Sequence, residues 1–465
     1  MSADLPAWLS DLGQEHVARR AAALDPAARE RLAAQLSSLD PSALRLQREV
    51  LATARRAASP RSPEPPVVLS PEGEERARLA QAGARTIAEG RVGVLIVAGG
   101  QGSRFGYDGP KGCFPVSPLR GLSFFELHAR KVRALRERTG AAVPLYVMTG
   151  PTNDAATRAF FAEKSYFGLP SADVRFVPQA SWPALDDEGR MLFDAPDHLF
   201  VSPDGHGGLL SALRATGALE DMETRGLSCL SYFQVDNALV QVADPLFVGL
   251  HESEGAEVSL KTFLRNSPTE ATGTIVSFDG RPGVLEYSDP SFTDEMKSAR
   301  LPDGSLRFAW GNAAMHLFSI PFLRRVAEAG LPVHLAHKKV PYCDETGACV
   351  KPEAPNAWKF EKFVFDAFPM ARRSVCLAID RAQEYAPLKE ATGPRGPEAV
   401  HRALSDRAAW WLESCGVAVP RDADGHSRFP IEIDPLYADG PDALRASVAS
   451  RSPAIDGPTV LSVES

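Results

Sequence analysis

The sequence predicts an α/β fold in which a parallel or mixed sheet is covered by helices on both faces, with a helical N-terminal region and a small C-terminal domain. Between residue 92 and about residue 380, short apolar runs typical of buried strands alternate with helical segments, which is the pattern of α/β proteins. Before residue 90, apolar residues recur at helical spacing instead. After residue 380, the pattern changes to one long helix and a short strand. We therefore expect domains at residues 1–90, 91–380 and 381–465.

The N-terminal region is rich in Ala, Leu, Arg and Glu and reads as amphipathic helices over residues 5–57. Its apolar stripes contain Leu5, Leu9, Leu12, Leu32, Leu36 and Leu39. A Pro-rich connector follows at residues 59–66. Ser70 and Pro71 suit the N-cap and the first position of the next helix, which we expect to end near Gly90.

The central region supplies the expected sheet. Beside the strand that begins at Val94, strands are expected at residues 144–149, 174–177, 229–235, 258–264 and 273–278. Helices are expected near residues 122–138 and 152–163, and the C-terminal domain should contain a helix near 398–414 and a strand over 428–434. Ligands of open α/β sheets bind at the carboxyl ends of the strands, so we searched for functional residues there.

Composition excludes some classes of function. The 465 residues carry a net charge of −8 without a long basic block, which disfavours broad nucleic-acid binding. No uninterrupted apolar stretch is long enough to span a membrane. The first residues lack a charged segment followed by an apolar core, so no secretory signal is expected. We therefore expect a cytoplasmic protein with neither nucleic acid nor membrane as a partner.

A glycine-rich loop follows the first strand of the central region. Residues 94–97 read as a buried parallel strand, and three glycines then occur between residues 99 and 102, where no Cβ obstructs a ligand. Such a backbone can direct N–H groups at phosphate oxygens. Arg104 and Lys111 add two cations to the same loop. The loop therefore predicts a polyphosphate site.

The spacing of this loop argues against two common phosphate-binding motifs. Phe105 stands at the third glycine position of G-x-G-x-x-G, and Lys111 is followed by Gly112 rather than by the Ser or Thr of a Walker motif. A glycine-rich turn with incidental cations is the structural alternative. The pattern G-G-x-G-[ST]-R-x-G-x-x-x-P-K resembles the signature loop of sugar-nucleotide pyrophosphorylases.

Asp236 comes at the end of the apolar run 229–235. At the carboxyl end of a strand, its carboxylate could hold Mg²⁺ against phosphate oxygens. On the residues alone, a capping role for Asp236 is an equal alternative.

Three other segments are ambiguous by themselves. Residues 203–208, Pro-Asp-Gly-His-Gly-Gly, form a turn whose amides could bind the polar edge of a base, or an ordinary loop. Residues 358–366 mix lysines with aromatic residues, and we expect an amphipathic helix that packs its phenylalanines. Lys389 follows a proline turn and alone would pass for a solvated lysine.

The order of these motifs resembles that of eukaryotic-type UDP-N-acetylhexosamine pyrophosphorylases over about residues 70 to 410. The Val-Asp-Asn sequence at residues 235–237 is closer to this branch than to typical UDP-glucose pyrophosphorylases. The resemblance implies a Rossmann-like, GT-A-like nucleotidyltransferase fold. The other matching segments are 285–288, 311–312, 338–342, 359–366 and 385–389.

The resemblance also implies roles for individual residues. Arg104, Lys111 and Lys389 would be catalytic cations on the phosphates, and Asp236 would bind Mg²⁺. The implied substrate-binding residues are Ala98, Gly99 and Gly100 at the nucleotide, Gln179, Gly205 and His206 at the uracil, Glu286, Tyr287 and Asn312 at the sugar, and Lys359 at the phosphates.

Three positions depart from the family pattern. His206 stands where Asn is common, and Ser103 replaces Thr but keeps the hydroxyl. Met315 stands where the acetylhexosamine branch has Asn, which exchanges an amide for a thioether. Either Met315 faces the sugar and relaxes its recognition, or it points into the core. The residues leave these two alternatives open.

The predicted activity is transfer of a uridylyl group from UTP to a sugar 1-phosphate, with release of pyrophosphate. N-acetylglucosamine 1-phosphate is the favoured substrate, and glucose 1-phosphate or a broad hexose range is the alternative. A catalytically silent UDP-sugar-binding protein is the alternative from another class. The attacking phosphate is already ionised, so positioning and charge stabilisation are expected to suffice without a protein nucleophile.

Overall fold

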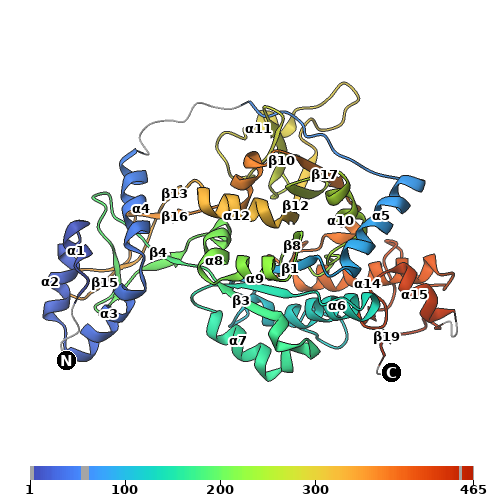
Figure 1. Ribbon diagram of the computed structural model, residues 1–465, viewed down its shortest axis with the longest axis horizontal. Helices are drawn as coiled ribbons and strands as arrows, with labels where there is room; N and C mark the ends of the chain where they lie inside the picture. The colour runs from blue at the N-terminus through green and yellow to red at the C-terminus, as the bar shows by residue number, and fades with distance from the viewer. Residues whose placement is uncertain (1–4, 54–61, 450–452, 464–465) are drawn as a thin grey trace. The chain divides into compact units, whose positions relative to one another are not determined.

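The computed structural model describes residues 5–53, 62–449 and 453–463, and the chain divides into two compact units (Figure 1). Unit 1 combines residues 1–60, 179–212 and 329–366, and unit 2 combines residues 61–178, 213–328 and 367–465. Helices α8 (Leu209–Ala215) and α12 (Ile320–Ala329) contain two of the boundaries. The expected domain limits at residues 90 and 380 stay a prediction, because the units are defined by packing and interleave along the chain.

Unit 2 contains the expected mixed sheet. Within the described residues, nine strands form it, and seven of them follow the order β11-β10-β12-β8-β1-β2-β3. Strands β8, β1, β2 and β3 are parallel, whereas β12 runs antiparallel to β8, β9 and β10. Their bounds are β1 Val92–Val97, β2 Leu145–Thr149, β3 Val174–Pro178, β8 Cys229–Gln234, β9 Val258–Leu264, β10 Thr274–Phe278, β11 Arg281–Leu285, β12 Trp310–Ser319 and β17 Ser374–Ala378. The predicted mixed α/β class is confirmed.

The central strands of this sheet are covered on both faces. In β2, every residue is buried, and in β1 only the last residue is partly exposed. Since successive side chains of a strand point to opposite faces, both faces must be packed against other elements. One face joins a core with apolar residues of α5, α6, α7 and α10.

Unit 2 contains the helices that the sequence predicts near residues 122–138, 152–163 and 398–414. Helices α5 and α10 lie side by side (Figure 1) and approach so closely that a Cβ on Gly83 would lie 1.9 Å from the carbonyl oxygen of Pro245. Only glycine fits at such an approach. The bounds are α5 Gly73–Ala88, α6 Phe124–Thr139, α7 Asp154–Glu163, α9 Ala218–Thr224, α10 Pro245–Ser253, α11 Asp294–Ser298, α13 Arg381–Glu384, α14 Pro397–Ser414 and α15 Pro441–Val448.

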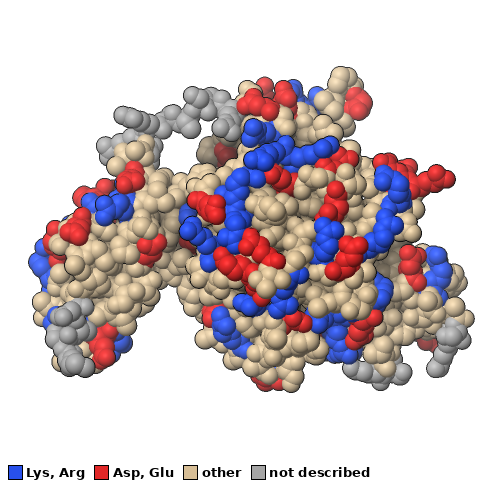
Figure 2. Space-filling view, in the orientation of Figure 1, with Lys and Arg blue, Asp and Glu red and all other residues tan. Residues whose placement is uncertain are grey.

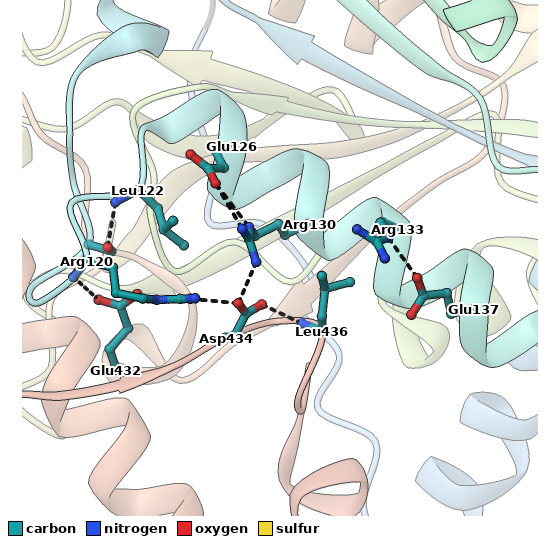
Figure 3. A network of polar contacts seen from close by, with 10 residues as sticks. Arg120, Leu122, Glu126, Arg130, Arg133, Glu137, Glu432, Asp434 and Leu436 are labelled. Atoms are coloured by element: carbon teal, nitrogen blue, oxygen red, sulfur yellow. Dashed lines mark hydrogen bonds and ion pairs between the residues drawn. The ribbon is translucent and has the colours of Figure 1, made fainter. Parts of the chain in front are cut away.

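The C-terminal part of unit 2 has its own apolar cluster, formed by α14, α15 and the strand pair β18 (Ile431–Ile433) and β19 (Thr459–Leu461). An ion-pair network joins it to α6 (Figure 3). Arg120 donates to Glu432 at 2.8 Å and to Asp434 at 2.7 Å, and Arg130 of α6 donates to Asp434 at 2.6 Å. The Asp434 side chain is fully buried, so these arginines neutralise a charge that water does not reach.

Unit 1 packs four helices against small strand pairs. The predicted amphipathic helices are confirmed up to residue 53, because Leu9, Leu12, Leu32, Leu36 and Leu39 share one core with Phe193 and Phe360. The last residues of this prediction, 54–57, lie outside the described residues. Part of the expected connector, residues 59–61, lies outside the described residues. The bounds are α1 Trp8–Asp11, α2 Glu15–Ala23, α3 Pro26–Ser38, α4 Pro41–Thr53, β4 Ser181–Pro183, β5 Phe193–Ala195, β6 His198–Leu199, β7 Val201–Pro203, β13 His334–Lys338, β14 Tyr342–Cys343, β15 Cys349–Val350 and β16 Ala357–Glu361.

Two local predictions were wrong. Helix α5 begins at Gly73, not after Ser70, because Leu69 pairs with β17 and keeps the chain extended at this point. The expected amphipathic helix over residues 358–366 is instead strand β16, paired with β13, followed by a 3-10 turn over Val364–Met370. Trp358 and Phe360 alternate with charged residues, and this period of two is the strand signal.

The face shown in Figure 2 carries Lys and Arg side chains interspersed with Asp and Glu. In unit 2, for example, Arg324 pairs with Glu223 at 2.5 Å and Arg325 with Glu257 at 2.7 Å. Within the part of the chain that the structure describes, no helix combines the length and apolar character that a membrane crossing requires.

Candidate active site

The glycine-rich loop leaves β1 and folds back on itself. The Lys111 N–H donates to the Gly100 carbonyl at 3.1 Å, and the Tyr107 N–H donates to the Gly102 carbonyl at 3.2 Å. A Cβ on Gly102 would lie 2.8 Å from the Tyr107 side chain, whereas a Cβ on Gly100 would have only the Lys111 side chain near it, at 4.0 Å. Glycine at position 102 therefore serves the packing of the loop, and glycine at position 100 leaves open space beside the loop.

Asn153 fastens this loop, although the sequence analysis did not single it out. Its side-chain amide donates to the carbonyl oxygens of Ala98 at 2.8 Å and Gly100 at 3.2 Å, and its own oxygen accepts from the Gly150 N–H at 2.7 Å. Asn153 is buried, so two carbonyl oxygens that would repel a phosphate are held toward the interior. An Asn at the carboxyl end of the strand next to β1 was the available signal.

Asp236 lies just beyond β8 and joins two of the predicted catalytic lysines. Lys111 Nζ lies 2.9 Å and Lys389 Nζ 2.7 Å from the same oxygen, Oδ2 of Asp236. Burial by itself would raise the pKa of this carboxyl, but the two ammonium groups outweigh burial and lower the pKa to about 2. The carboxylate is therefore ionised at neutral pH, between two cations that come from distant parts of the chain.

The segment that carries Lys389 is held against the end of β8 by backbone and amide contacts. The Leu388 N–H donates to the Asp236 carbonyl at 3.0 Å, and the Ala386 N–H donates to the side-chain oxygen of Asn237, also at 3.0 Å. The Asn237 amide donates in turn to the Glu384 carbonyl at 2.8 Å. The Asn237 side chain therefore holds the segment before Lys389 in place, and this fixes the position of Lys389 relative to Asp236.

A buried lysine strengthens this arrangement. Lys261 of β9 is 1% exposed, and its Nζ lies 2.7 Å from Asp244 and 2.5 Å from Glu384. Burial would lower the pKa of Lys261, but the two carboxylates raise it. The cluster ties the start of α10 and the segment before Lys389 to the sheet. Because its residues come from three distant segments, no local sequence pattern predicts this cluster.

The residues predicted at the sugar lie in the same unit. Glu286 follows β11, and burial raises its pKa while the charge of Lys389 opposes the rise. Asn312 is half-buried and accepts the Ala314 N–H at 2.9 Å, and Tyr287 is exposed. The pKa of Glu286 thus responds to the charge of Lys389, which belongs to the Asp236 cluster.

Met315 is buried, 3% exposed, and belongs to the core beneath the sheet. The Asn237 amide points to its sulfur at 3.7 Å. The structure therefore favours the alternative in which Met315 packs in the core rather than facing the sugar.

The residues predicted at the uracil lie in unit 1, which is described by itself. Gly205 has φ +81°, and a Cβ there would lie 2.4 Å from the Lys362 carbonyl oxygen. The ring of His206 lies 5.5 Å from that of Phe363 and 5.3 Å from that of Phe365. Gln179 donates to Asp204 at 3.3 Å. The turn at residues 203–208 therefore lies against two aromatic rings and beside the amide of Gln179. Aromatic rings and an oriented amide are both suited to a flat base.

Asp204 was not predicted and is 1% exposed. Burial raises its pKa to about 6, although Lys362 and the Gln179 amide oppose the rise. Lys362 also contacts the Trp182 ring, with its Nζ 4.8 Å from the centroid. Asp204 orients Gln179 from beneath the turn, and the Asp in the Pro-Asp-Gly-His motif was the sequence signal for it.

Arg104 is a predicted cation of unit 2 that does not join the Asp236 cluster. Arg104 is exposed and forms no ion pair with another described residue. Lys359 belongs to unit 1, where its Nζ lies 4.6 Å from the centroid of the Phe200 ring, and its pKa is lowered first by burial and then by Lys338.

A cation site at this cluster would depend on Asp236. Among residues 5–53, 62–449 and 453–463, no group of three or more His, Cys, Asp or Glu side chains could enclose a metal ion. Mg²⁺ is commonly held by one or two carboxylates together with substrate phosphates, so a single buried, ionised carboxylate fits it.

Comparisons with known proteins show which proteins the chain resembles. The chain is 36% identical to UDP-N-acetylhexosamine pyrophosphorylase-like protein 1 of Homo sapiens, over 94% of this chain and 90% of that protein. It is 35% identical to UDP-N-acetylglucosamine pyrophosphorylase of Saccharomyces cerevisiae, over 72% of this chain and 73% of that protein.

A solved structure also resembles this chain over almost its whole length. The uridine diphosphate N-acetylglucosamine pyrophosphorylase of Trypanosoma brucei superimposes with a TM-score of 0.83 at 27% identity, over 98% of each chain. The family model described as UTP–glucose-1-phosphate uridylyltransferase matches residues 71–394, which include the glycine-rich loop, Asp236 and Lys389. The chain is therefore a member of the UTP–glucose-1-phosphate uridylyltransferase family.

Proposed function

We propose that this chain joins UTP and N-acetylglucosamine 1-phosphate to form UDP-N-acetylglucosamine and pyrophosphate. The observation that carries the proposal is the contact of Lys111 and Lys389 with one oxygen of Asp236, at the carboxyl ends of the parallel strands and after the glycine-rich loop. Ligands of such sheets bind at the carboxyl ends of the strands. Two cations beside a loop of exposed amides suit a triphosphate.

The reaction balances without a proton transfer. An oxygen of the sugar 1-phosphate attacks the α-phosphorus of UTP, a new P–O bond forms, and the bond to the oxygen that bridges to the β-phosphorus breaks. The electron pair leaves with pyrophosphate. Lys111 and Lys389 stabilise the charge that grows on the phosphate oxygens, and the loop amides orient the nucleotide.

Asp236 is the residue that would hold Mg²⁺ together with phosphate oxygens. Bound there, the ion would neutralise negative charge as a Lewis acid. A pKa of about 2 keeps this carboxylate ionised at neutral pH.

In unit 1, Gln179, Gly205 and His206 would bind the uracil. Glu286, Tyr287 and Asn312 of unit 2 would contact the sugar. The choice of N-acetylglucosamine rests on the names of the relatives from yeast and Trypanosoma brucei, and on the buried position of Met315, which removes the argument for a relaxed sugar site. The expected cytoplasmic location also stays a prediction, which subcellular fractionation would test.

The test is pyrophosphate release from UTP with a panel of sugar 1-phosphates. We expect the highest kcat/KM with N-acetylglucosamine 1-phosphate. A higher value with glucose 1-phosphate would favour the UDP-glucose alternative. UDP-sugar binding without release of pyrophosphate, with any sugar, would favour a silent binding protein.

A further inference from the structure

Gln234 is the last residue of β8 and stands beside the Asp236 cluster. Phe233 and Val235 are both buried in the core of unit 2. Because side chains alternate between the faces of a strand, the Gln234 side chain leaves β8 on the face opposite to Phe233. Asp236 follows two positions later, in the turn beyond the strand. Gln234 is only half-buried, so its amide reaches the surface on which Lys389 lies.

Gln234 contacts the catalytic lysine directly. Its Oε1 accepts a hydrogen bond from Lys389 Nζ at 3.0 Å, and the same Nζ lies 2.7 Å from Asp236 Oδ2. An ammonium group can only donate, so the amide oxygen is the atom that must face it. Two of the three N–H groups of Lys389 are therefore directed at protein oxygens, which restricts the direction of the third.

Such a restriction matters for a lysine that acts on a transition state. The lysine side chain is long and flexible, and ordering it during the reaction costs rotamer entropy. Asp236 alone would fix the distance between the ammonium group and its carboxylate. The ammonium group could still rotate about that single contact. The second contact from Gln234 fixes its orientation before the substrates bind, which is how preorganised charge lowers a barrier.

The position of β8 supports the same role. Gln234 pairs in register with Val97, the last residue of β1, after which the glycine-rich loop begins. Gln234 thus lies next to the residue after which the loop proposed to hold phosphates begins, and its amide contacts the lysine proposed to stabilise them. A glutamine here adds a polar contact without adding charge beside the polyphosphate.

We propose that Gln234 is a positioning residue for Lys389 in the uridylyl transfer. This inference rests on the proposed function, since it concerns the same reaction. Gln234 acts through Lys389 and therefore affects turnover only while that lysine is present.

A double-mutant cycle tests this dependence. Gln234→Leu, Lys389→Met and the double variant are assayed for pyrophosphate release from UTP and N-acetylglucosamine 1-phosphate. We expect Gln234→Leu to lower kcat roughly 10-fold or more with little change in KM, and to have less than about a 2-fold effect in the Lys389→Met background. Gln81→Leu, at an exposed position of α5, is the matched control and should turn over like the native enzyme.

Equal losses in both backgrounds, or no loss in the native background, would overturn the inference. Circular dichroism and thermal unfolding check that each variant folds, and Gln234→Met, which keeps the length of the chain, replaces Gln234→Leu if the latter does not. Absence of turnover in the native enzyme would overturn the proposed function and this inference with it, whereas native turnover with equal losses overturns the inference alone.

Discussion

Lys389 Nζ lies 2.7 Å from Oδ2 of Asp236, so a residue that follows the last strand of the sheet completes a site at the end of β8. The contacts that hold this pair in place include the backbone hydrogen bond from Leu388 to the Asp236 carbonyl, the hydrogen bond from Lys389 to Gln234 and the buried Lys261–Glu384 pair. The proposed site therefore extends at least to residue 389, which lies within the region 71–394 that the family model matches.

Asp236→Asn should lower kcat at least about 100-fold, because the amide neither pairs with two lysines nor holds a divalent cation as a carboxylate does. Excess chelator should abolish turnover of the native enzyme, and added Mg²⁺ should restore it. Steady-state kinetics at saturating UTP measure both effects. Turnover that survives either treatment at the native rate would contradict the proposed role of Asp236.

Met315→Asn should leave the ratio of kcat/KM values for N-acetylglucosamine and glucose 1-phosphates unchanged, because Met315 is buried in the core. The same change should lower the melting temperature, since an amide in an apolar core needs partners for all its polar atoms. A shift of the ratio toward the acetylated sugar would show instead that this position contacts the sugar.

Asp204→Asn should stabilise the protein at alkaline pH. Burial raises the pKa of Asp204 to about 6, above the value of about 4 expected in the unfolded chain. The native state thus binds the proton more tightly, and the free energy of unfolding falls as pH rises from about 4 to 6, by roughly 1–3 kcal/mol in all. The uncharged variant escapes this loss.

The melting temperature of Asp204→Asn should therefore exceed that of the native protein at pH 8 and approach it at pH 4. Asp442→Asn, whose carboxyl is fully exposed, is the control and should follow the native protein at both pH values. A pH-independent difference would contradict the predicted titration.

Asp434→Ala should cost about 3 kcal/mol of unfolding free energy, because it removes the fully buried carboxylate that Arg120 and Arg130 share and leaves them only Glu432 and Glu126 (Figure 3). Glu137→Ala removes the exposed pair with Arg133 on the same helix and should cost less than about 0.5 kcal/mol. Urea denaturation measures both values. Equal costs would contradict the importance given to burial.

The sheet could be predicted because its strands are short apolar runs whose residues are buried on both faces. Residues 258–264 match β9, and 229–235 match β8 within one residue. The family could be predicted because its motifs are local, ordered segments, and the family match confirms that prediction.

The rest depends on contacts between distant residues. Lys261 acts through Asp244 at the start of α10 and Glu384 in α13, and Asn153 acts on Ala98 and Gly100 after β1, so the partners that show these roles lie far away in the sequence. The helix prediction for residues 358–366 was wrong for another reason. These residues show helical spacing of aromatic side chains as well as the alternation of Trp358 and Phe360 with charged residues. Pairing with β13 stabilises the strand.

The most direct test of the proposed reaction determines which product receives the phosphate oxygens of the sugar 1-phosphate. N-acetylglucosamine 1-phosphate labelled with ¹⁸O at the nonbridging phosphate oxygens is incubated with UTP, Mg²⁺ and the native enzyme, and the products are analysed by mass spectrometry. Attack of the sugar phosphate on the α-phosphorus predicts that UDP-N-acetylglucosamine carries all of the label and that pyrophosphate carries none. Label in pyrophosphate, or release of UMP in its place, would contradict the proposed reaction.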